Sequence, residues 1–308
     1  MMTEKNNLES QCGSAFLKDA KKVTAQYGKT FYFASLFMGP RHTQRSYKLY
    51  QLCRFLDDIA DTKGDSSGEI DKFYALIKSN THNSQINLCK DFSLPSFPLE
   101  HLVEGFLFDQ NSPLIEDVDG LIRYCYQVAG TVGIMMCYAL DTSEEGALPH
   151  AIDLGIAMQM TNIARDVFED AKLGRVYIPN QWLEEKSQHC LFSNQPHIGI
   201  KRAQIKLLKL AERYYKSGLA GLHYLPLRSR FAIFVAAQCY RAIGTEVISS
   251  TGSEQRAYVP TTKKMIITSQ CMLNFLKSGY GRLWQEEHDL RLHDSLGVFF
   301  SPQIRTSS

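Results

Sequence analysis

The sequence predicts an all-α fold. Nearly every long segment repeats its apolar residues with the period of a helix, and no stretch alternates β-branched residues as a strand would. The segments are separated by short stretches rich in Gly, Ser, Asn or Asp, such as 62–69 and 250–255. We therefore expect helices at about 12–26, 43–60, 69–79, 97–108, 117–139, 147–171, 201–223, 227–249 and 262–287.

The size and charge of the chain limit the class of protein to which it can belong. With 308 residues, of which 44% are hydrophobic, the chain can bury a substantial core. No internal repeat or long linker divides it, so we expect one all-α domain over 1–308 with flexible tails at about 1–11 and 295–308. The formal net charge is +2 and neither half carries a long basic run, which argues against nucleic acid as a partner.

The cysteines and the N-terminal residues predict a cytoplasmic protein. The eight cysteines are scattered, without a C-x-x-C pair or a zinc-like cluster, which is typical of small buried side chains in a reducing compartment. The polar start MMTEKNNLESQ lacks a hydrophobic signal core, and we see no apolar run approaching the roughly 18 residues of a membrane span. We interpret His293 and Asp294 as a surface pair rather than a metal site.

The stretch NIARDVFED, residues 162–170, places oxygen-bearing side chains on one face of a helix. Asn162, Asp166 and Asp170 recur every four positions, each step rising about 6 Å. The preceding run LGIAMQM is apolar, which indicates an interior helix. Acids that enter a core need positive partners, and those partners are either basic side chains or metal ions.

Another acidic stretch, LYQLCRFLDDIAD, is the first of the two in chain order and ends an earlier predicted helix, so NIARDVFED is the second. Asp57 and Asp61 share one face, and Asp58 lies about 100° away. Acids at the negative end of a helix dipole repel it, although a solvated helix end also explains them. Together the two stretches predict opposite walls of a cavity in a helical bundle.

Clustered Asp and Asn oxygens suit Mg²⁺ or Mn²⁺, which take their remaining ligands from water and substrate phosphates. The implied substrate carries a diphosphate. A nucleoside triphosphate is not indicated, because the sequence has no Gly-rich P-loop.

From about Tyr27 to about Lys277 the chain resembles the squalene and phytoene synthases. DDIAD resembles the first aspartate-rich motif of that family, and QMTNIARDVFEDAKLGRVYIP resembles the second. GKTFYFAS, YCYQVAGTVG and QCYRAIGTEV resemble further family segments, and LAGLHYLPLRSRFAIFVAAQCYRAIG favours the bacterial phytoene synthase branch. The resemblance implies an isoprenoid synthase-type helical bundle with a central cavity.

The resemblance also implies an activity, that of a prenyltransferase in carotenoid biosynthesis. Two geranylgeranyl diphosphates would condense head to head through prephytoene diphosphate to phytoene, with metal-assisted loss of diphosphate and without NADPH. The alternatives are condensation of farnesyl diphosphate to presqualene diphosphate, squalene or dehydrosqualene, chain elongation with isopentenyl diphosphate, and a degenerate helical protein that binds lipid or serves assembly. The long hydrocarbon product implies a peripheral membrane contact, for which the apolar run 31–38 is a candidate.

The same resemblance assigns roles to individual residues. Asp57 and Asp61 are expected metal ligands with Asp58 as an accessory, and Asn162, Asp166 and Asp170 are expected ligands on the second wall. Arg54 and Arg165 either contact phosphate or pair with these aspartates. Aromatic cavity positions are matched by Phe31, Tyr50, Tyr124 and Tyr240, channel positions by Val128, Val132 and Gly133, and further site positions by Gln159 and Tyr177.

The carboxylates of Asp57, Asp61, Asp166 and Asp170 are expected to be catalytic through the metal ions that they bind. The Tyr240 ring is expected to stabilise carbocations. One position departs from some relatives, because Ser35 stands where they carry a bulky aromatic residue. A small side chain there favours the longer geranylgeranyl chain, unless Phe33, Phe37 or Met38 fills the same volume. The final proton acceptor and the oligomeric state are left open by the sequence.

Overall fold

The computed structural model describes residues 20–61, 68–78, 94–110, 114–250, 256–281, 284 and 286–300. Within these ranges the fold is all-α, as predicted, and the sole β feature is an isolated bridge between Leu114 and Val176. The α-helices are α2 (Ala20–Tyr27), α3 (Lys29–Ser35), α4 (Pro40–Asp61), α5 (Glu69–Lys78), α7 (Phe97–Gln110), α8 (Val118–Cys125), α9 (Thr131–Ala139), α10 (Ala147–Lys172), α11 (Glu185–Phe192), α12 (Ile198–Ala220), α13 (Leu227–Ser249) and α14 (Thr261–Lys277). Shorter turns are η2 (Tyr126–Gly130), η3 (Asn180–Trp182), η4 (Gly221–Tyr224) and η6 (Leu290–Leu296).

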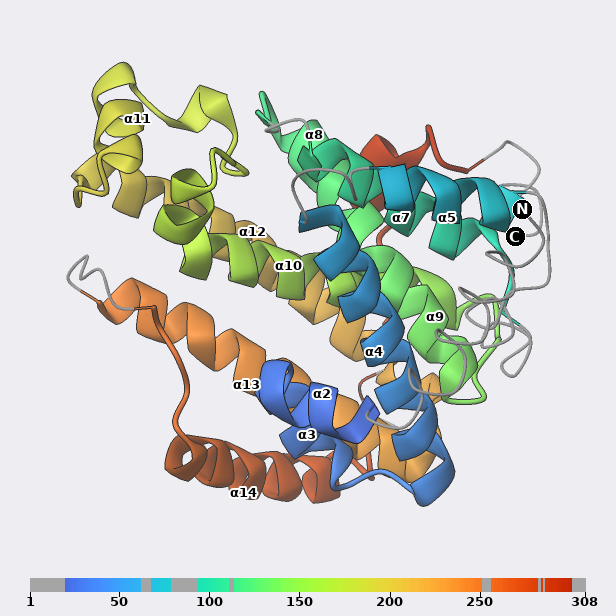
Figure 1. The fold of residues 1–308 in the computed structure, drawn as a ribbon. Helices are drawn as coiled ribbons and strands as arrows, with labels where there is room; N and C mark the ends of the chain where they lie inside the picture. The colour runs from blue at the N-terminus through green and yellow to red at the C-terminus, as the bar shows by residue number, and fades with distance from the viewer. Residues whose placement is uncertain are drawn as a thin grey trace.

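Helix α10 lies at the centre of the bundle, packed along α12 and contacted by α9, η2 and α13 (Figure 1). The neighbouring backbones approach closely because two glycines carry no side chain. A Cβ on Gly133 would lie 2.1 Å from the Ala151 carbonyl oxygen, and one on Gly155 would lie 2.2 Å from that of Ala129. The apolar run before Asn162 is therefore an interior helix, as the sequence predicts.

Three apolar clusters surround this centre. The first joins α8, η2, α10 and α12, and the second joins α4, α5, α7 and α9. The third joins α13 and α14 to Met38, Leu140 and Leu222. Helices α4 and α10, which carry the two acidic stretches, thus belong to different clusters, and α9 packs between them.

Most expected helices are present within a few residues, and 227–249 has the predicted bounds. Helix α4 begins three residues early at Pro40, because proline suits the first turn of a helix. The prediction did not include α3 or α11 as helices. The expected helix 12–26 is observed only from Ala20, since 12–19 lie outside the described ranges.

Two expected helices are interrupted. The helix expected at 117–139 is present as α8, η2 and α9 in direct succession, and its middle five residues, Tyr126–Gly130, form a π-helical turn. The helix 262–287 was wrong beyond Lys277, because Gly279, Tyr280 and Gly281 have φ values of 60°, 60° and 79°. Glycine adopts this left-handed conformation readily, so the SGYG sequence ends α14.

The chain end folds back on the bundle. Leu296 is fully buried and Phe299 packs on Tyr126 with ring centroids 4.9 Å apart, so a flexible tail does not begin at 295. The expected tail at 1–11 and residues 301–308 lie outside the described part of the chain.

The expectation of no span-like apolar run also needs correction. Among the residues described, α13 alone is long and apolar enough for a membrane span by length and composition, with a mean hydropathy of 1.3 over its best window. More than half of that window, 56%, is buried against neighbouring helices, as in a core helix. The buried thiols of Cys125, Cys137, Cys190, Cys239 and Cys271 are consistent with the sequence interpretation.

Candidate active site

The second acidic stretch lies on α10 with its side chains partly buried. Asn162 donates through Nδ2 to the Gln159 Oε1 atom at 3.2 Å. The Asn162 Oδ1 atom is buried and has no hydrogen-bond partner within the described part of the chain. This arrangement leaves an oxygen lone pair available for a positively charged ligand, since buried carbonyl oxygens otherwise have partners.

Asp166 is held by two arginines. Arg165 donates Nε to Oδ1 at 2.7 Å and Nη2 to Oδ2, and Arg256 donates Nε to Oδ1 at 2.7 Å and Nη2 to Oδ2 at 2.9 Å. Burial opposes ionisation of Asp166, but the hydrogen bonds from Arg165 and Arg256 outweigh it and hold the pKa of the carboxyl below its ordinary value. Of the alternatives for Arg165, pairing with the motif aspartate is the arrangement seen here.

Asp170 lies one turn further along α10, and its pKa is shifted in the opposite direction to that of Asp166. Its burial, followed by the negative charge of Asp166, raises its pKa from 3.8 to about 7, although Arg175 opposes this. Gly174, with φ of 80°, ends the helix and lets the chain turn back, so that the Arg175 amide donates to the Asp170 carbonyl at 2.9 Å. A buried carboxyl that ionises reluctantly is stabilised when a cation binds beside it.

The first acidic stretch ends α4 and is more exposed. Arg54 donates Nη1 to Asp57 Oδ2 at 3.0 Å and Nη2 to Asp58 Oδ1, while its guanidinium carbon lies 4.9 Å from the Tyr27 ring centroid. Pairing with the aspartates is therefore the arrangement observed for Arg54 as well. Asp61 is the last residue of α4, and its side chain lies outside the described atoms.

Asp109 on α7, which the sequence interpretation missed, lies between the two acidic stretches. The Tyr177 hydroxyl donates to its Oδ1 at 2.8 Å and the Tyr124 hydroxyl to its Oδ2 at 3.1 Å. Burial is the main cause that raises the pKa of Asp109 from 3.8 to about 6; Asp57 contributes to this shift, and the two hydrogen bonds and Arg175 oppose it. Asp109 also contributes to the raised pKa of Asp170, so both walls lie within electrostatic range of one carboxyl.

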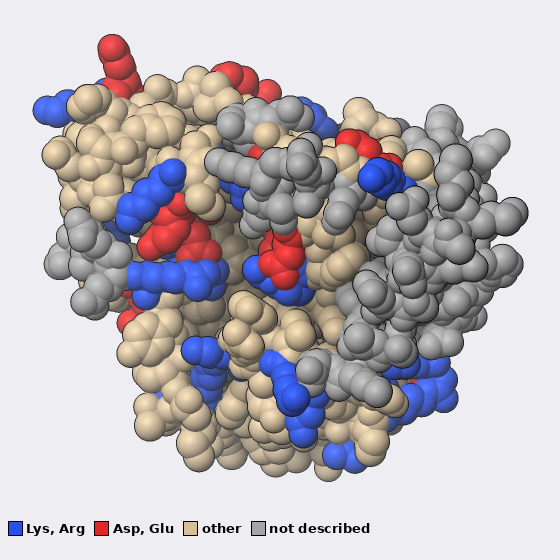
Figure 2. All heavy atoms as spheres, in the orientation of Figure 1, with Lys and Arg blue, Asp and Glu red and all other residues tan. Residues whose placement is uncertain are grey.

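Figure 2 shows the mouth of this region from outside. Two of the acidic groups visible in this view lie near its centre, one near the upper end of α4 and the other near the end of α10, and each adjoins basic side chains (Figures 1 and 2). The surface between them is hollowed. The tertiary structure thus places the two predicted walls on the same face of the bundle.

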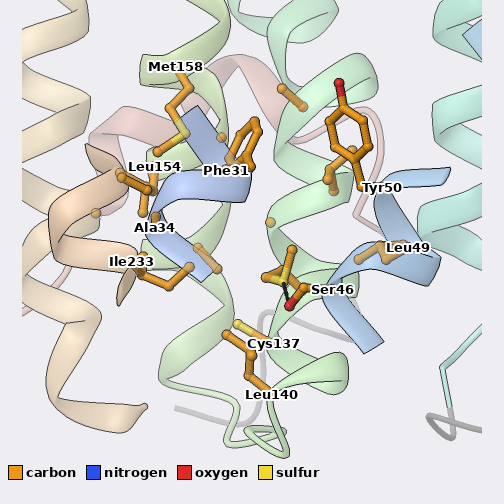
Figure 3. Close-up of a pocket in the computed structure, with 18 of the residues that line it drawn as sticks. Phe31, Ala34, Ser46, Leu49, Tyr50, Cys137, Leu140, Leu154, Met158 and Ile233 are labelled. Atoms are coloured by element: carbon orange, nitrogen blue, oxygen red, sulfur yellow. Dashed lines mark hydrogen bonds between the residues drawn. The ribbon is translucent and has the colours of Figure 1, made fainter. Parts of the chain in front are cut away.

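An apolar cavity of about 270 Å³ extends inward from the second wall, where Gln159 and Asn162 line it. Figure 3 shows Phe31 and Tyr50 toward one end and Cys137 and Leu140 toward the other. The predicted positions Phe31, Tyr50, Val128, Val132, Gly133, Gln159 and Tyr240 all line this cavity.

Three aromatic rings separate the acidic groups from the apolar part of the cavity. The Phe31 ring lies 6.0 Å from Tyr50 and 5.3 Å from Tyr240 between centroids. Tyr50 lies within electrostatic range of Asp57, and Tyr240 within that of Asp166. Burial is the largest cause of the raised pKa of both phenols, which keeps these rings neutral.

Tyr124 does not occupy the cavity wall on which it was expected. It is buried and stacks on Tyr177, with ring centroids 4.6 Å apart and an interplanar angle of 13°, and both hydroxyls point to Asp109. The reason is that an isolated carboxylate in α7 needs donors, and two phenols supply them. Tyr124 and Tyr177 therefore adjoin the acidic groups rather than the cavity wall.

The residues around Ser35 settle which side chains occupy the cavity beside it. Ser35 lines the cavity, and its hydroxyl bonds with the Tyr47 hydroxyl at 2.7 Å. Met38 also lines it, whereas Phe33 and Phe37 pack on each other in the α13 cluster and are absent from the cavity wall. Of the alternatives, only Met38 can compensate for the small side chain at 35.

His293 is not the surface residue that the sequence suggested. Its side chain is only 15% exposed and its Nε2 bonds to the buried Asp153 carboxylate, while the adjacent Asp294 is exposed as expected. The HD pair is thus divided between the interior and the surface, because His293 lies beside the buried Leu292 on the inner side of η6 and Asp294 lies on the outer side.

The sequence interpretation missed two site residues. Arg256 stands in an irregular segment before α14 and reaches Asp166 only through the tertiary fold. Asp109 is the third acid of α7, after Glu100 and Glu104, and it directly follows the apolar run GFLF, which was an available signal. The full arrangement is a water-accessible mouth with carboxylates and arginines above an apolar cavity, which can bind a charged head group and enclose an apolar chain.

Comparison with known proteins agrees with this geometry. A family profile described as Squalene/phytoene synthase matches residues 24–263. A 15-cis-phytoene synthase of Enterobacter agglomerans is 34% identical over 264 residues, covering 78% of this chain and 89% of the relative. A 15-cis-phytoene synthase of Pantoea ananas is 33% identical over 281 residues, covering 82% of this chain and 90% of the relative.

Solved structures share the fold. A dehydrosqualene synthase crystallised with a ligand superposes with a TM-score of 0.74 at 24% identity, covering 86% of this chain and 97% of that one. A squalene synthase from Alicyclobacillus acidocaldarius gives 0.66 at 19% identity, covering 75% and 92%. The chain belongs to the squalene/phytoene synthase family, and it is a prenyltransferase that joins prenyl diphosphates head to head.

Proposed function

We propose that the protein condenses two molecules of geranylgeranyl diphosphate to phytoene through prephytoene diphosphate, in carotenoid biosynthesis. The observation that carries the substrate choice is the small Ser35 in the cavity wall, with Phe33 and Phe37 turned into a neighbouring cluster. This arrangement leaves room for a longer prenyl chain. The relatives named phytoene synthase support the same substrate.

The oxygen donors of the two walls fit Mg²⁺ or Mn²⁺. The Asn162 Oδ1 atom lacks a partner in the described structure, and the raised pKa of Asp170 reflects a carboxyl short of positive neighbours. Both findings are expected at a hard-cation site, whose ligands are oxygens. We assign Asp57, Asp58 and Asp61 to one wall and Asn162, Asp166 and Asp170 to the other, and such ions would stabilise the departing diphosphate as Lewis acids.

The basic residues would complete the binding of diphosphate. Arg54, Arg165 and Arg256 presently pair with the motif aspartates, and their forked donors match phosphate oxygens. With cations held by the carboxylates, these guanidinium groups would be free to donate to the phosphate oxygens of the substrate. Asp109, bonded to Tyr124 and Tyr177, positions these phenols beside the acidic groups.

The aromatic residues would protect the carbocation. The rings of Phe31, Tyr50 and Tyr240 lie where the head group meets the apolar chain, so their faces can stabilise allylic and cyclopropylcarbinyl cations. Val128 and Val132 line the cavity beside them and exclude water. We expect no requirement for NADPH, since phytoene forms without reduction.

The membrane contact proposed here differs from the sequence expectation. Four residues of the run 31–38 line the cavity and two more, Phe33 and Phe37, pack in the α13 cluster, so most of the run is not available to a bilayer. Helix α14 instead presents an apolar outer face made of exposed Met265, Ile266, Met272, Leu273 and Leu276.

The positive charge of residues in and near α14 favours contact of the same face with anionic lipid. Residues 20–56 and 256–281 contain Lys and Arg but no Asp or Glu. The α14 residues Cys271 and Phe275 pack in the same cluster as Met38 and Leu222, which line the cavity, so α14 packs on an apolar cluster that reaches the cavity wall. Peripheral attachment of a cytoplasmic enzyme through α14 would deliver the hydrocarbon to the bilayer.

The test of the substrate assignment is a product assay. Purified protein with Mg²⁺ is incubated separately with geranylgeranyl and farnesyl diphosphate, with and without NADPH, and products are identified by mass. We expect phytoene from the C20 substrate in both conditions. Squalene or dehydrosqualene from the C15 substrate, with no phytoene at all, would favour the alternative reaction, and no condensation with either would favour the lipid-binding or assembly role.

A further inference from the structure

A buried carboxylate lies behind the cavity, on the same helix as the second acidic wall. Asp153 of α10 is 0% exposed. His293 Nε2 lies 2.8 Å from its Oδ1, His288 Nε2 lies 2.9 Å from its Oδ2, and the Ser217 hydroxyl donates to Oδ2. No lysine or arginine in the described part of the chain bonds to it. A buried carboxylate is costly without a positive partner, so the imidazoles or an ion bound by them must supply the charge.

The three side chains converge on one point. One ligand atom from each of Asp153, His288 and His293 lies within 4.8 Å of the other two. Two imidazole nitrogens and a carboxylate oxygen form a donor set that zinc accepts and that Mg²⁺ rarely takes, because Mg²⁺ prefers oxygen alone. The set is distinct from the diphosphate site, since Asp153 precedes Asn162 by nine positions and thus by about 13 Å along the helix.

We propose that Asp153, His288 and His293 bind a zinc ion that fastens the C-terminal segment 286–300 to α10. Bonds of about 2.0–2.1 Å from zinc separate tetrahedral ligands by about 3.3 Å, so the two imidazoles move outward by about 0.5 Å to admit the ion. The fourth position is filled by water or by the Ser217 hydroxyl, which already adjoins the carboxylate.

The surrounding residues form the second layer of such a site. The Ser217 carbonyl of α12 accepts a hydrogen bond from His150 Nδ1 of α10 at 2.7 Å, which holds the two helices together at this point. His150 in turn lines the substrate cavity. Zinc at Asp153 would therefore brace the inner wall of the cavity from behind without touching the substrate.

The segment that zinc would fasten has few regular hydrogen bonds of its own. It consists of the short turns of η6, with Leu292 and Leu296 buried and the Leu292 carbonyl accepting from the Tyr214 hydroxyl at 2.9 Å. Phe299 packs on Tyr126 within the π-helical turn that ends beside the cavity. Binding free energy at a metal site is folding free energy, so zinc would stabilise this segment most.

The test uses full-length, tag-free protein stripped of metal and then equilibrated with zinc or cobalt. We expect wild-type protein to retain one more zinc per chain than His293→Asn, by elemental analysis. Bound Co²⁺ should give the intense visible bands of a tetrahedral nitrogen-containing site in wild type and lose them in the variant. Zinc should also raise the unfolding temperature of wild type by several degrees more than that of the variant.

The matched control is His189→Asn, the same change at an exposed histidine of α11. It should keep the wild-type zinc content and cobalt spectrum, as should Asp166→Asn, which alters only the diphosphate site. Equal zinc content in wild type and His293→Asn, with no tetrahedral cobalt bands, would overturn the proposal and leave a hydrogen-bonded cluster. If His293→Asn does not fold, the wild-type cobalt spectrum alone decides.

Discussion

Arg256 and Asp166 form a two-point ion pair between segments 90 residues apart, with Nε 2.7 Å from Oδ1 and Nη2 2.9 Å from Oδ2. Arg165, the neighbour of Asp166 in sequence, holds the same carboxylate from the other side. Two cations on one carboxylate are more than its charge requires. The arrangement is suited to a site that awaits a diphosphate and its metal ions, to which the guanidinium groups can turn.

Replacing Arg256 with glutamine should lower the catalytic efficiency toward the prenyl diphosphate substrate. We expect kcat/KM to fall by about 10²-fold, because a charged donor to phosphate contributes roughly 2–4 kcal/mol in a site that excludes water. Arg291→Gln is the control, since that side chain is 82% exposed and pairs only with Asp289. Equal steady-state constants for Arg256→Gln and wild type would contradict a phosphate-binding role.

Asp57→Asn and Asp166→Asn should each abolish most turnover, by about 10²–10³-fold or more. The change keeps the side-chain volume but removes the charge that a divalent ion requires, so Mn²⁺ binding measured by electron paramagnetic resonance should weaken in parallel. Asp71→Asn, at an exposed position of α5, should behave as wild type in both measurements. Unchanged Mn²⁺ affinity in both motif variants, with intact helical circular dichroism, would remove these residues as metal ligands.

Ser35→Phe should shift the chain-length preference. The ring would enter the cavity beside Met38, and the ratio of kcat/KM for geranylgeranyl over farnesyl diphosphate should fall by at least about tenfold. The adjacent Leu36→Phe serves as control, because Leu36 is 61% exposed and absent from the cavity wall. A parallel loss of activity with both substrates would instead indicate that the hydrogen bond between Ser35 and Tyr47 was needed for folding.

The stability of the metal-free protein should fall as pH rises through 6, in part because of Asp109. Its pKa is about 6 in the folded protein and near 3.8 when unfolded, so between pH 4 and 6 the folded state binds more protons. This contribution is complete below about pH 4 and is lost as pH rises past 6. Asp109→Asn should flatten that part of the profile of unfolding temperature against pH, whereas Asp71→Asn should leave it unchanged. An identical slope in Asp109→Asn would show that another group causes it.

Ile266→Glu combined with Leu273→Glu should reduce flotation with anionic liposomes by at least tenfold, because each apolar side chain contributes about 1.5–3 kcal/mol when buried in lipid. Activity on substrate in detergent should be retained, since neither residue lines the cavity. Ile198→Glu with Leu290→Glu changes two residues away from α14 that are at least as exposed, and this variant should float like wild type. Equal flotation of both double variants would exclude α14 as the contact, and a change of oligomeric state only in the α14 variant would indicate a second copy as its partner.

The sequence by itself determined the fold class, the central helix and the spacing of both acidic stretches, since helical period and i, i+4 spacing are local properties. It also supplied the cavity positions Phe31, Tyr50, Val128, Val132 and Tyr240 through resemblance. The π-helical turn within 117–139 and the early end of α14 were missed, because one depends on packing against α10 and the other on the backbone angles of SGYG.

Only the tertiary structure decided which charges meet. Asp109, Arg256 and the pair Asp153 and His293 come from segments far apart in the chain, so no local pattern connects them. Their pairing follows from burial, since a carboxylate removed from water must find donors or cations wherever the fold brings them. The acidic face of NIARDVFED could be identified from its spacing, but which of its oxygens lack partners depended on the folded chain.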